Sequence, residues 1–346
     1  MIFLKQSKFP LYRLILFCIV LLTVFCSETV HAQPQNQQRQ QSQPAAGPRR
    51  VMKVNVNFVS NGLRIEGILF RPTDAGRLPA IVISHPAGGV KEQTVSIYAE
   101  RLAGRGFAAL VFDAAYQGES EGEPRGLEDP FQRAEDIRSA VTYLSNRSDI
   151  DENRIGALGI CASGSYVPFT AQSDLRIKAA ATISAIQIAS AVFANPIARN
   201  AALIQAGQLR NAEARGEGVF MTNYAPSNKA EADAMPPRSL AAESYEYYRT
   251  SRGAHSRSTQ WGIMRMDVAA HFDAYRNIEW ISPRPLLMIA GTDADTRNIS
   301  EEAIARAAEP KELFLIQGAS HVDLYDRDPY VQAAVDKLAD FFGRYL

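Results

Sequence analysis

Apolar and polar residues alternate along two neighbouring segments near residue 51, and farther along the chain this alternation gives way to compact apolar runs. The segments VNVNFVS and LRIEGILFRP flank Asn61-Gly62, which predicts a β-hairpin. Six apolar runs follow: LPAIVISHP, FAALVFDAA, RIGALGI, IKAAATIS, PRPLLMIAG and KELFLIQG. Amphipathic segments separate most of them, including SIYAERLAGRG, FQRAEDIRSAVTYLSNR and DPYVQAAVDKLADFFGRYL. This pattern predicts an α/β fold with a mostly parallel, doubly wound sheet and an antiparallel hairpin at one edge.

One interval, about residues 185–282, is too long for an ordinary crossover between strands. It is rich in alanine and contains SYEYYRT, Trp261, Met264, Met266 and Phe272. We interpret it as a largely helical insertion that forms a lid over the carboxyl edge of the sheet.

The first 32 residues have the pattern of a secretory signal peptide. Basic residues precede the apolar run LILFCIVLLTVF, and Val30-His31-Ala32 offers small residues at a cleavage point. The run is shorter than the ~20 residues of a typical membrane-spanning helix. We therefore expect cleavage after Ala32 and a periplasmic or secreted protein, with membrane association only if this segment is retained.

Residues 33–50, QPQNQQRQQSQPAAGPRR, contain almost no apolar side chains and are interpreted as a flexible Gln/Pro-rich linker. The folded domain is expected to span residues 51–346. Its lone cysteine would be Cys161, because Cys18 and Cys26 belong to the signal segment.

Composition narrows the range of partners. Lys+Arg and Asp+Glu number 37 each, so no excess charge favours nucleic acid or an anionic surface. No phosphate-binding loop or cluster of metal-binding cysteines is evident. We expect a small-molecule substrate, no cofactor and no metal, and we make no prediction of the oligomeric state.

The stretch GALGICASGSY places a cysteine and a serine at a junction between a strand and a helix. A nucleophile elbow has the form small-x-nucleophile-x-small, because larger flanking residues would clash in the sharp turn. Gly159 to Ser163 satisfies this form with Cys161 at its centre, whereas a shifted frame would centre Ser163. The apolar run ends at Ile160, which favours Cys161. A helix N-terminus is expected to lower the pKa of this thiol; the alternative is a buried, inert thiol.

A nucleophile of this kind needs a base and an orienting acid, which follow it along the chain with the acid first. Among the histidines only His321, in GASHVDLYD, follows the last predicted strand; His85 belongs to an earlier loop, and His255 and His271 fall in the insertion. The acid is expected in the loop GTDAD, as Asp295 or alternatively Asp293.

Two backbone N–H groups aimed at one point would form an oxyanion hole. One is expected from Ala162, directly after the nucleophile. The other is expected from Ala87 in SHPAGGVKEQ, because Pro86 has no N–H and the following glycines allow a close approach.

From about Val51 to the C-terminus the chain resembles the α/β-hydrolase superfamily, and most closely its dienelactone-hydrolase-like branch. The motifs that carry the resemblance are SHPAGG, FDAAYQGES, GICAS, GTDAD and GASHVD. The resemblance implies an α/β-hydrolase fold and a Cys–His–Asp triad without a cofactor, acting on esters, lactones or related acyl compounds. The chain departs from the branch at Ser163, where glycine is more usual, and in the length of its insertion.

These observations predict an exported acyl hydrolase that forms a covalent acyl-enzyme on Cys161. Two alternatives stay open. One is a serine-type esterase or peptidase that uses Ser163. The other is a non-catalytic protein in which the cleft only binds a ligand.

Overall fold

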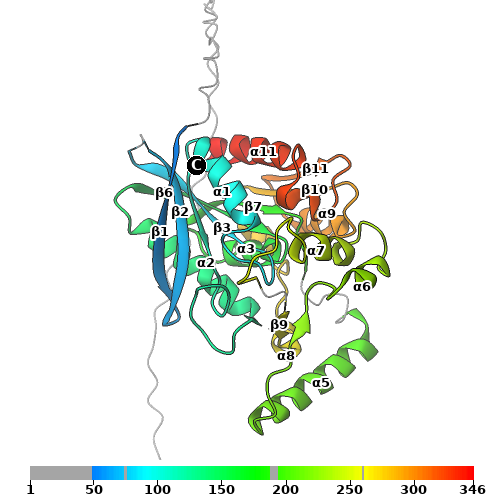
Figure 1. Ribbon diagram of the computed structural model, residues 1–346. Coiled ribbons are helices and arrows are strands. Elements are labelled where there is room, and N and C mark those ends of the chain that lie inside the picture. Colours follow the sequence, from blue (N-terminus) through cyan, green and yellow to red (C-terminus); the bar gives the residue numbers. More distant parts are fainter. Residues whose placement is uncertain (1–48, 74–75, 188–193, 259–260) are drawn as a thin grey trace, which may run out of the picture. The chain divides into compact units, whose positions relative to one another are not determined.

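The computed structural model describes residues 49–73, 76–187, 194–258 and 261–346. An eight-stranded sheet with the order β1-β2-β4-β3-β6-β7-β10-β11 organises them (Figure 1). Its strands are β1 (Val51–Ser60), β2 (Leu63–Pro72), β3 (Leu78–Ser84), β4 (Ala108–Phe112), β6 (Ile150–Ile160), β7 (Ile177–Ile183), β10 (Leu286–Gly291) and β11 (Lys311–Ile316). The pairs β1–β2 and β2–β4 are antiparallel, and the other pairs are parallel. The predicted sheet and its antiparallel edge are therefore confirmed, whereas the expected signal peptide lies outside the described residues.

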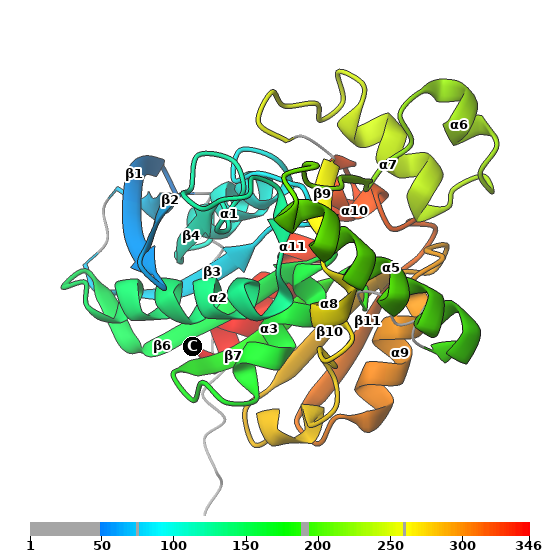
Figure 2. The ribbon, with the colours of Figure 1, turned by 90° about the horizontal axis from the view of Figure 1, so that it is seen from below.

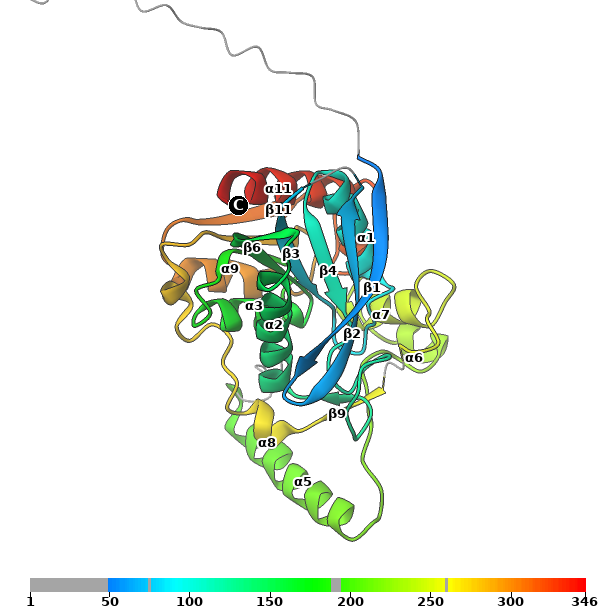
Figure 3. The same cartoon turned by 90° about the vertical axis from the view of Figure 1, so that its left-hand side faces the viewer.

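Helices cover both faces of this sheet (Figures 2 and 3). On one face pack α2 (Pro130–Ser145), α3 (Ser163–Ala171) and α9 (Arg297–Arg306); on the other pack α1 (Thr94–Gly104), α10 (Asp323–Asp326) and α11 (Tyr330–Tyr345). Along β3, Ala80 and Val82 enter the first core, and Ile81 and Ile83 enter the second. The inner parallel strands thus bury side chains on both faces, which is why their sequences are continuous apolar runs, whereas β1 buries only one face.

The hairpin between β1 and β2 turns at Asn61 and Gly62, as predicted. Their φ angles are 47° and 82°, both in the left-handed region that asparagine and glycine tolerate. The turn pairs Ser60 with Leu63, and this register continues to the pair Val51–Pro72.

The insertion combines helices with a small second sheet. It contains α5 (Pro196–Ala214), β8 (Thr222–Asn223), α6 (Lys229–Asp233), α7 (Leu240–Tyr248), β9 (Trp261–Met264), α8 (Met266–Ala269) and the 3-10 helix η1 (Ile278–Ile281). Strand β9 pairs with β8 and with β5 (Leu127–Glu128), which precedes the insertion in the chain. Strands of two to four residues leave no periodic apolar pattern, so the sequence did not reveal them. No helix in the described ranges has the length and hydropathy needed to cross a bilayer.

Candidate active site

Cys161 occupies a tight turn between β6 and α3. Its φ is 58°, a left-handed conformation that costs a non-glycine residue about 1–3 kcal/mol. Three backbone hydrogen bonds hold this conformation. The Cys161 N–H donates to Ile183 O at 3.0 Å, and the Cys161 carbonyl accepts from Gly164 N at 2.9 Å and from Ile186 N at 3.2 Å. A Cβ on Gly159 would lie 1.9 Å from the Ser163 carbonyl oxygen, so the turn requires glycine there. The local geometry is that of a nucleophile elbow centred on Cys161.

The side chain of Cys161 faces a cavity of about 340 Å³. Ala87 from the loop after β3, Tyr325 from α10 and several residues of the insertion form the other walls. Cys161 itself is only 6% exposed. A substrate that reaches the thiol must therefore occupy this cavity, which lies between the sheet edge and the insertion.

Ser163 points away from the cavity into the protein interior. Its hydroxyl lies 2.6 Å from His85 O and 2.9 Å from Ser84 Oγ, and it accepts a hydrogen bond from Arg133 Nη2 at 2.9 Å. Arg133 also lies 3.4 Å from the buried carboxylate of Glu128. The contacts of Ser163 are therefore those of a structural residue that joins α3 to β3 and α2.

His321 lies in the loop between β11 and α10, near the end of the sheet where Cys161 is found. The ring is fully buried, with Nδ1 2.7 Å from Thr296 Oγ1 and Nε2 3.2 Å from the hydroxyl of Tyr325. If Nε2 accepts the Tyr325 proton, the neutral ring carries its own proton on Nδ1 and donates it to Thr296. His321 does not itself line the cavity, and neither do His255 and His271.

Tyr325 connects the thiol to the imidazole. Its buried hydroxyl lies 3.2 Å from His321 Nε2, and it also favours the thiolate form of the neighbouring Cys161 by lowering the pKa of that thiol. Tyr247 and Tyr248 of α7 pack edge-on against its ring, with ring centroids 5.1 Å and 6.4 Å away. The sequence analysis missed this residue. The available signal was its position four residues after His321, a spacing that places two side chains on one face of a helical turn.

The expected contact between an aspartate and His321 is absent from the described structure. Asp295 Oδ2 accepts a hydrogen bond from the Leu240 N–H at 2.9 Å, and Asp293 lies 3.6 Å from Arg238 Nη1. Both carboxylates thus bind residues of the insertion, which sequence spacing does not show. Thr296, directly after Asp295, is the residue that contacts His321 Nδ1.

Burial keeps the Cys161 thiol and the His321 imidazole neutral. It raises the pKa of Cys161 to about 11, although the Tyr325 hydroxyl and the Ala162 N–H favour the thiolate. It lowers the pKa of His321 to about 3. The expectation that the helix N-terminus would lower the pKa of the thiol is therefore wrong, because loss of solvent outweighs these hydrogen bonds.

His85 shapes the loop that carries Ala87. Its Nε2 accepts the Ala114 N–H at 3.0 Å, and its Nδ1–H donates to Pro86 O at 2.7 Å. Burial, with the nearby Arg133 guanidinium, holds the pKa of His85 well below its usual value. A neutral ring thus ties this loop to the end of β4, which leaves Ala87 at the cavity wall.

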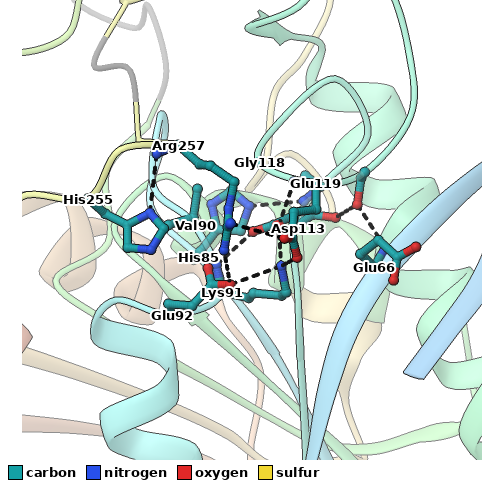
Figure 4. Close-up of polar contacts among 12 residues, drawn as sticks. Glu66, His85, Val90, Lys91, Glu92, Asp113, Gly118, Glu119, His255 and Arg257 are labelled. Carbon is teal, nitrogen blue, oxygen red and sulfur yellow. Dashed lines mark hydrogen bonds and ion pairs between the residues drawn. The ribbon is translucent and has the colours of Figure 1, made fainter. Parts of the chain in front are cut away.

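A buried ion pair anchors the far end of the same loop (Figure 4). Lys91 Nζ lies 2.7 Å from both Asp113 Oδ2 and Glu119 Oε2, and the Lys91 N–H donates to Asp113 Oδ1 at 2.7 Å. Burial acts to lower the pKa of Lys91, but these carboxylates raise it, so the ammonium stays charged. Arg257 of the insertion pairs with Glu92 and Glu119. The loop is thus held from β4 on one side and from the insertion on the other.

Comparison with known proteins agrees with the fold described above. The model of the Dienelactone hydrolase family matches residues 65–209. The uncharacterized protein YcjY of Escherichia coli (strain K12) is 37% identical over 309 residues, which cover 86% of this chain and 100% of that protein. The chain belongs to the dienelactone hydrolase family. It is an α/β hydrolase, as the motifs in the sequence implied.

Two further relatives extend this comparison. The uncharacterized protein PA2218 of Pseudomonas aeruginosa is 36% identical over 82% of this chain and 78% of its own length. Its crystal structure matches with a TM-score of 0.79 over 91% of this chain and 100% of that chain. The thiohydrolase aneE of Aspergillus aculeatus is 27% identical over 69% of this chain and 76% of its own. The fold of this chain is thus shared by PA2218 over the whole length of that crystal structure.

Proposed function

We propose that this α/β hydrolase cleaves acyl esters or thioesters through a covalent acyl-enzyme on Cys161. The observation that carries the proposal is the position of Tyr325, which lines the cavity together with Cys161 and whose hydroxyl lies 3.2 Å from His321 Nε2. Similarity to a protein named thiohydrolase supports thioesters as one substrate class.

The first step is acylation of the thiol. Sγ attacks the acyl carbonyl carbon, the thiol proton passes to the Tyr325 oxygen, and the Tyr325 proton passes to His321 Nε2. Because Tyr325 gains one proton and loses another, it remains neutral throughout. The N–H groups of Ala162 and Ala87 would stabilise the oxyanion, and Thr296 would orient the imidazolium through Nδ1.

The second step releases the acid. The proton on His321 returns along the same route to the leaving alcohol or thiol as the tetrahedral intermediate collapses. A water molecule in the cavity then attacks the thioester carbonyl and gives a proton to the Tyr325 oxygen as the Tyr325 proton passes to His321 Nε2. The Cys161 sulfur leaves and is reprotonated along the same route. Hydrolysis thus restores the neutral thiol and the neutral imidazole without any cofactor.

The nucleophile is tested by trapping the intermediate. With 4-nitrophenyl butanoate, the wild-type protein should gain one butanoyl mass on the peptide that contains Cys161. Cys161→Ala should lose this adduct and the turnover, whereas Ser163→Ala should keep both when rates are normalised to folded protein. An adduct on another residue, or full turnover by Cys161→Ala, would refute the proposal.

Tyr325→Phe tests the proton path. Removing the hydroxyl should slow acylation by about 100-fold, the lower range for loss of general base catalysis. Tyr247→Phe is the matched control, because Tyr247 packs on Tyr325 but does not line the cavity. If Tyr325→Phe acylates as fast as the wild type, His321 reaches the thiol directly and the hydroxyl has no part in the transfer.

A further inference from the structure

A second cavity adjoins the catalytic cavity inside the insertion. Its volume is about 210 Å³, and α5 contributes Ala202, Ala206 and Leu209 to its walls. Tyr224 and Met264 belong to the walls of both cavities. The two spaces therefore meet at these two side chains, and the flexible thioether of Met264 is a contact that can adapt to an occupant.

The walls of both cavities contain no lysine, arginine, aspartate or glutamate among the described residues. A phosphate or carboxylate placed there would be buried without a counter-charge, which is strongly unfavourable. The second cavity is lined mainly by alanine, leucine, phenylalanine and methionine. Its chemistry suits an uncharged, apolar group.

Ion pairs mark the outer limit of this apolar space. Beyond Ala206 and Leu209, a neighbouring pocket is bordered by Arg210, Glu213, Arg265 and Asp267. Arg210 pairs with Asp267, and Arg265 pairs with Glu213 at 3.1 Å. An apolar chain that extends from Cys161 through the second cavity would thus meet charged groups at its far end.

We propose that the second cavity holds the distal part of the substrate's acyl chain, so that the enzyme acts on medium-chain acyl esters or thioesters. This inference rests on the proposed function, because it assumes that the acyl carbonyl lies at Cys161. The chain passes Tyr224 and Met264, lies against α5 and ends near the ion pairs. The cavity therefore selects the acyl group rather than the leaving group.

A series of 4-nitrophenyl esters from acetyl to tetradecanoyl tests the proposal with the full-length protein. Burial of each added methylene should raise kcat/KM about three- to four-fold. The rise should continue beyond butanoyl and stop once the chain reaches the ion pairs. A flat dependence on chain length, or a steady fall beyond acetyl, would overturn the proposal.

Two matched substitutions test whether the chain-length dependence of kcat/KM arises in the second cavity: Ala202→Trp and Ala201→Trp. Both residues lie on α5, but Ala202 lines the second cavity, whereas Ala201 is exposed and lines neither cavity. Ala202→Trp should lower kcat/KM for the decanoyl ester by at least about ten-fold, the loss of two buried methylenes or more, and leave the acetyl ester unchanged. Ala201→Trp should behave as the wild type. Equal losses for all chain lengths in Ala202→Trp would contradict the proposal.

Binding to Cys161→Ala separates this inference from the proposed function. Calorimetry with 1-butanol, 1-octanol and 1-decanol should show tighter binding of the longer alcohols, and Ala202→Trp should abolish that gain. If these alcohols bind in this way but no ester or thioester is hydrolysed, the proposed function fails and the cavity assignment stands. If chain length has no effect on binding, the cavity assignment fails whether or not hydrolysis occurs.

Discussion

At the scale of single residues, the proposed reaction depends on the environment of one thiol. Cys161 is buried beside Tyr325, and its pKa is raised to about 11. A cysteine nucleophile that forms a thiolate–imidazolium pair at rest needs a depressed thiol pKa. Here the thiol and the imidazole are both neutral at pH 7, so in the proposed mechanism loss of the thiol proton has to accompany attack on the substrate.

Alkylation of Cys161 should accordingly be slow. A shift of the thiol pKa from the usual value near 8.5 to 11 lowers the thiolate fraction at pH 8 by about 200-fold, and higher nucleophilicity recovers about ten-fold of this. Iodoacetamide should therefore modify Cys161 about 20-fold more slowly than a free cysteine peptide, with a rate that rises up to about pH 11. Peptide mapping distinguishes Cys161 from Cys18 and Cys26. Fast labelling at pH 7 would show that the resting site holds a thiolate.

Thr296 and Asp295 can be compared directly as orienting residues. Thr296→Val removes the acceptor at His321 Nδ1 and should lower kcat/KM about ten-fold, the value of one hydrogen bond. Asp295→Asn keeps an oxygen that can accept the Leu240 N–H, so it should change kcat/KM less than Thr296→Val. A larger loss of kcat/KM in Asp295→Asn than in Thr296→Val would show that the aspartate, not the threonine, orients His321.

At the scale of elements, two loops at the carboxyl ends of neighbouring strands bring the site together. The loop after β3 presents Ala87, and the turn after β6 presents Cys161. The ion pair between Lys91 and Asp113 joins the first loop to the end of β4. Gly118 is required here, because a Cβ on it would lie 2.2 Å from the Asp113 carboxyl group.

Lys91→Met should therefore destabilise the fold. It leaves the Asp113 carboxylate, which is fully buried, without its cation and should cost about 3–5 kcal/mol of unfolding free energy. Urea denaturation measures this loss. Lys53→Met is the control, because Lys53 forms an exposed ion pair with Glu100 that contributes at most about 1 kcal/mol. Equal losses of unfolding free energy in the two variants would show that the buried ion pair stabilises the fold no more than the exposed one.

At the scale of the whole molecule, buried histidines couple folding to pH. The pKa of His321 is lowered to about 3, and that of His85 is lowered well below its usual value. The unfolded chain binds protons at these residues below about pH 6.5, whereas the folded chain does not. Their contribution to stability is therefore complete above pH 6.5 and declines as the pH falls towards 3.

The urea midpoint should consequently fall between pH 7 and pH 4. His321→Gln should make this fall shallower, because the variant removes one group that binds a proton mainly in the unfolded state. His271→Gln, at an exposed position, serves as the comparison. A wild-type midpoint that rises on acidification would contradict the neutral, buried state of these rings.

The sequence predicted the features that local rules control. The Asn61-Gly62 turn needs residues that tolerate positive φ, and the apolar runs of the parallel strands are long enough to be recognised without tertiary information. The predicted residues Cys161 and Ala87 share one cavity, and His321 connects with Cys161 through Tyr325. The second sheet was missed, because its short strands are stabilised by pairing between distant segments.

The amino-acid sequence alone determined the order of the strands along the chain, the elbow around Cys161 and the position of His321 after the last strand, because each depends on residues close together in the chain. Only the tertiary structure decided that Tyr325 lies between the thiol and the imidazole, that Thr296 rather than an aspartate contacts Nδ1, and that the thiol pKa is raised. These features depend on burial and on contacts between segments far apart in sequence. The insertion, for example, excludes solvent from the site, and its Leu240 N–H donates a hydrogen bond to the Asp295 carboxylate.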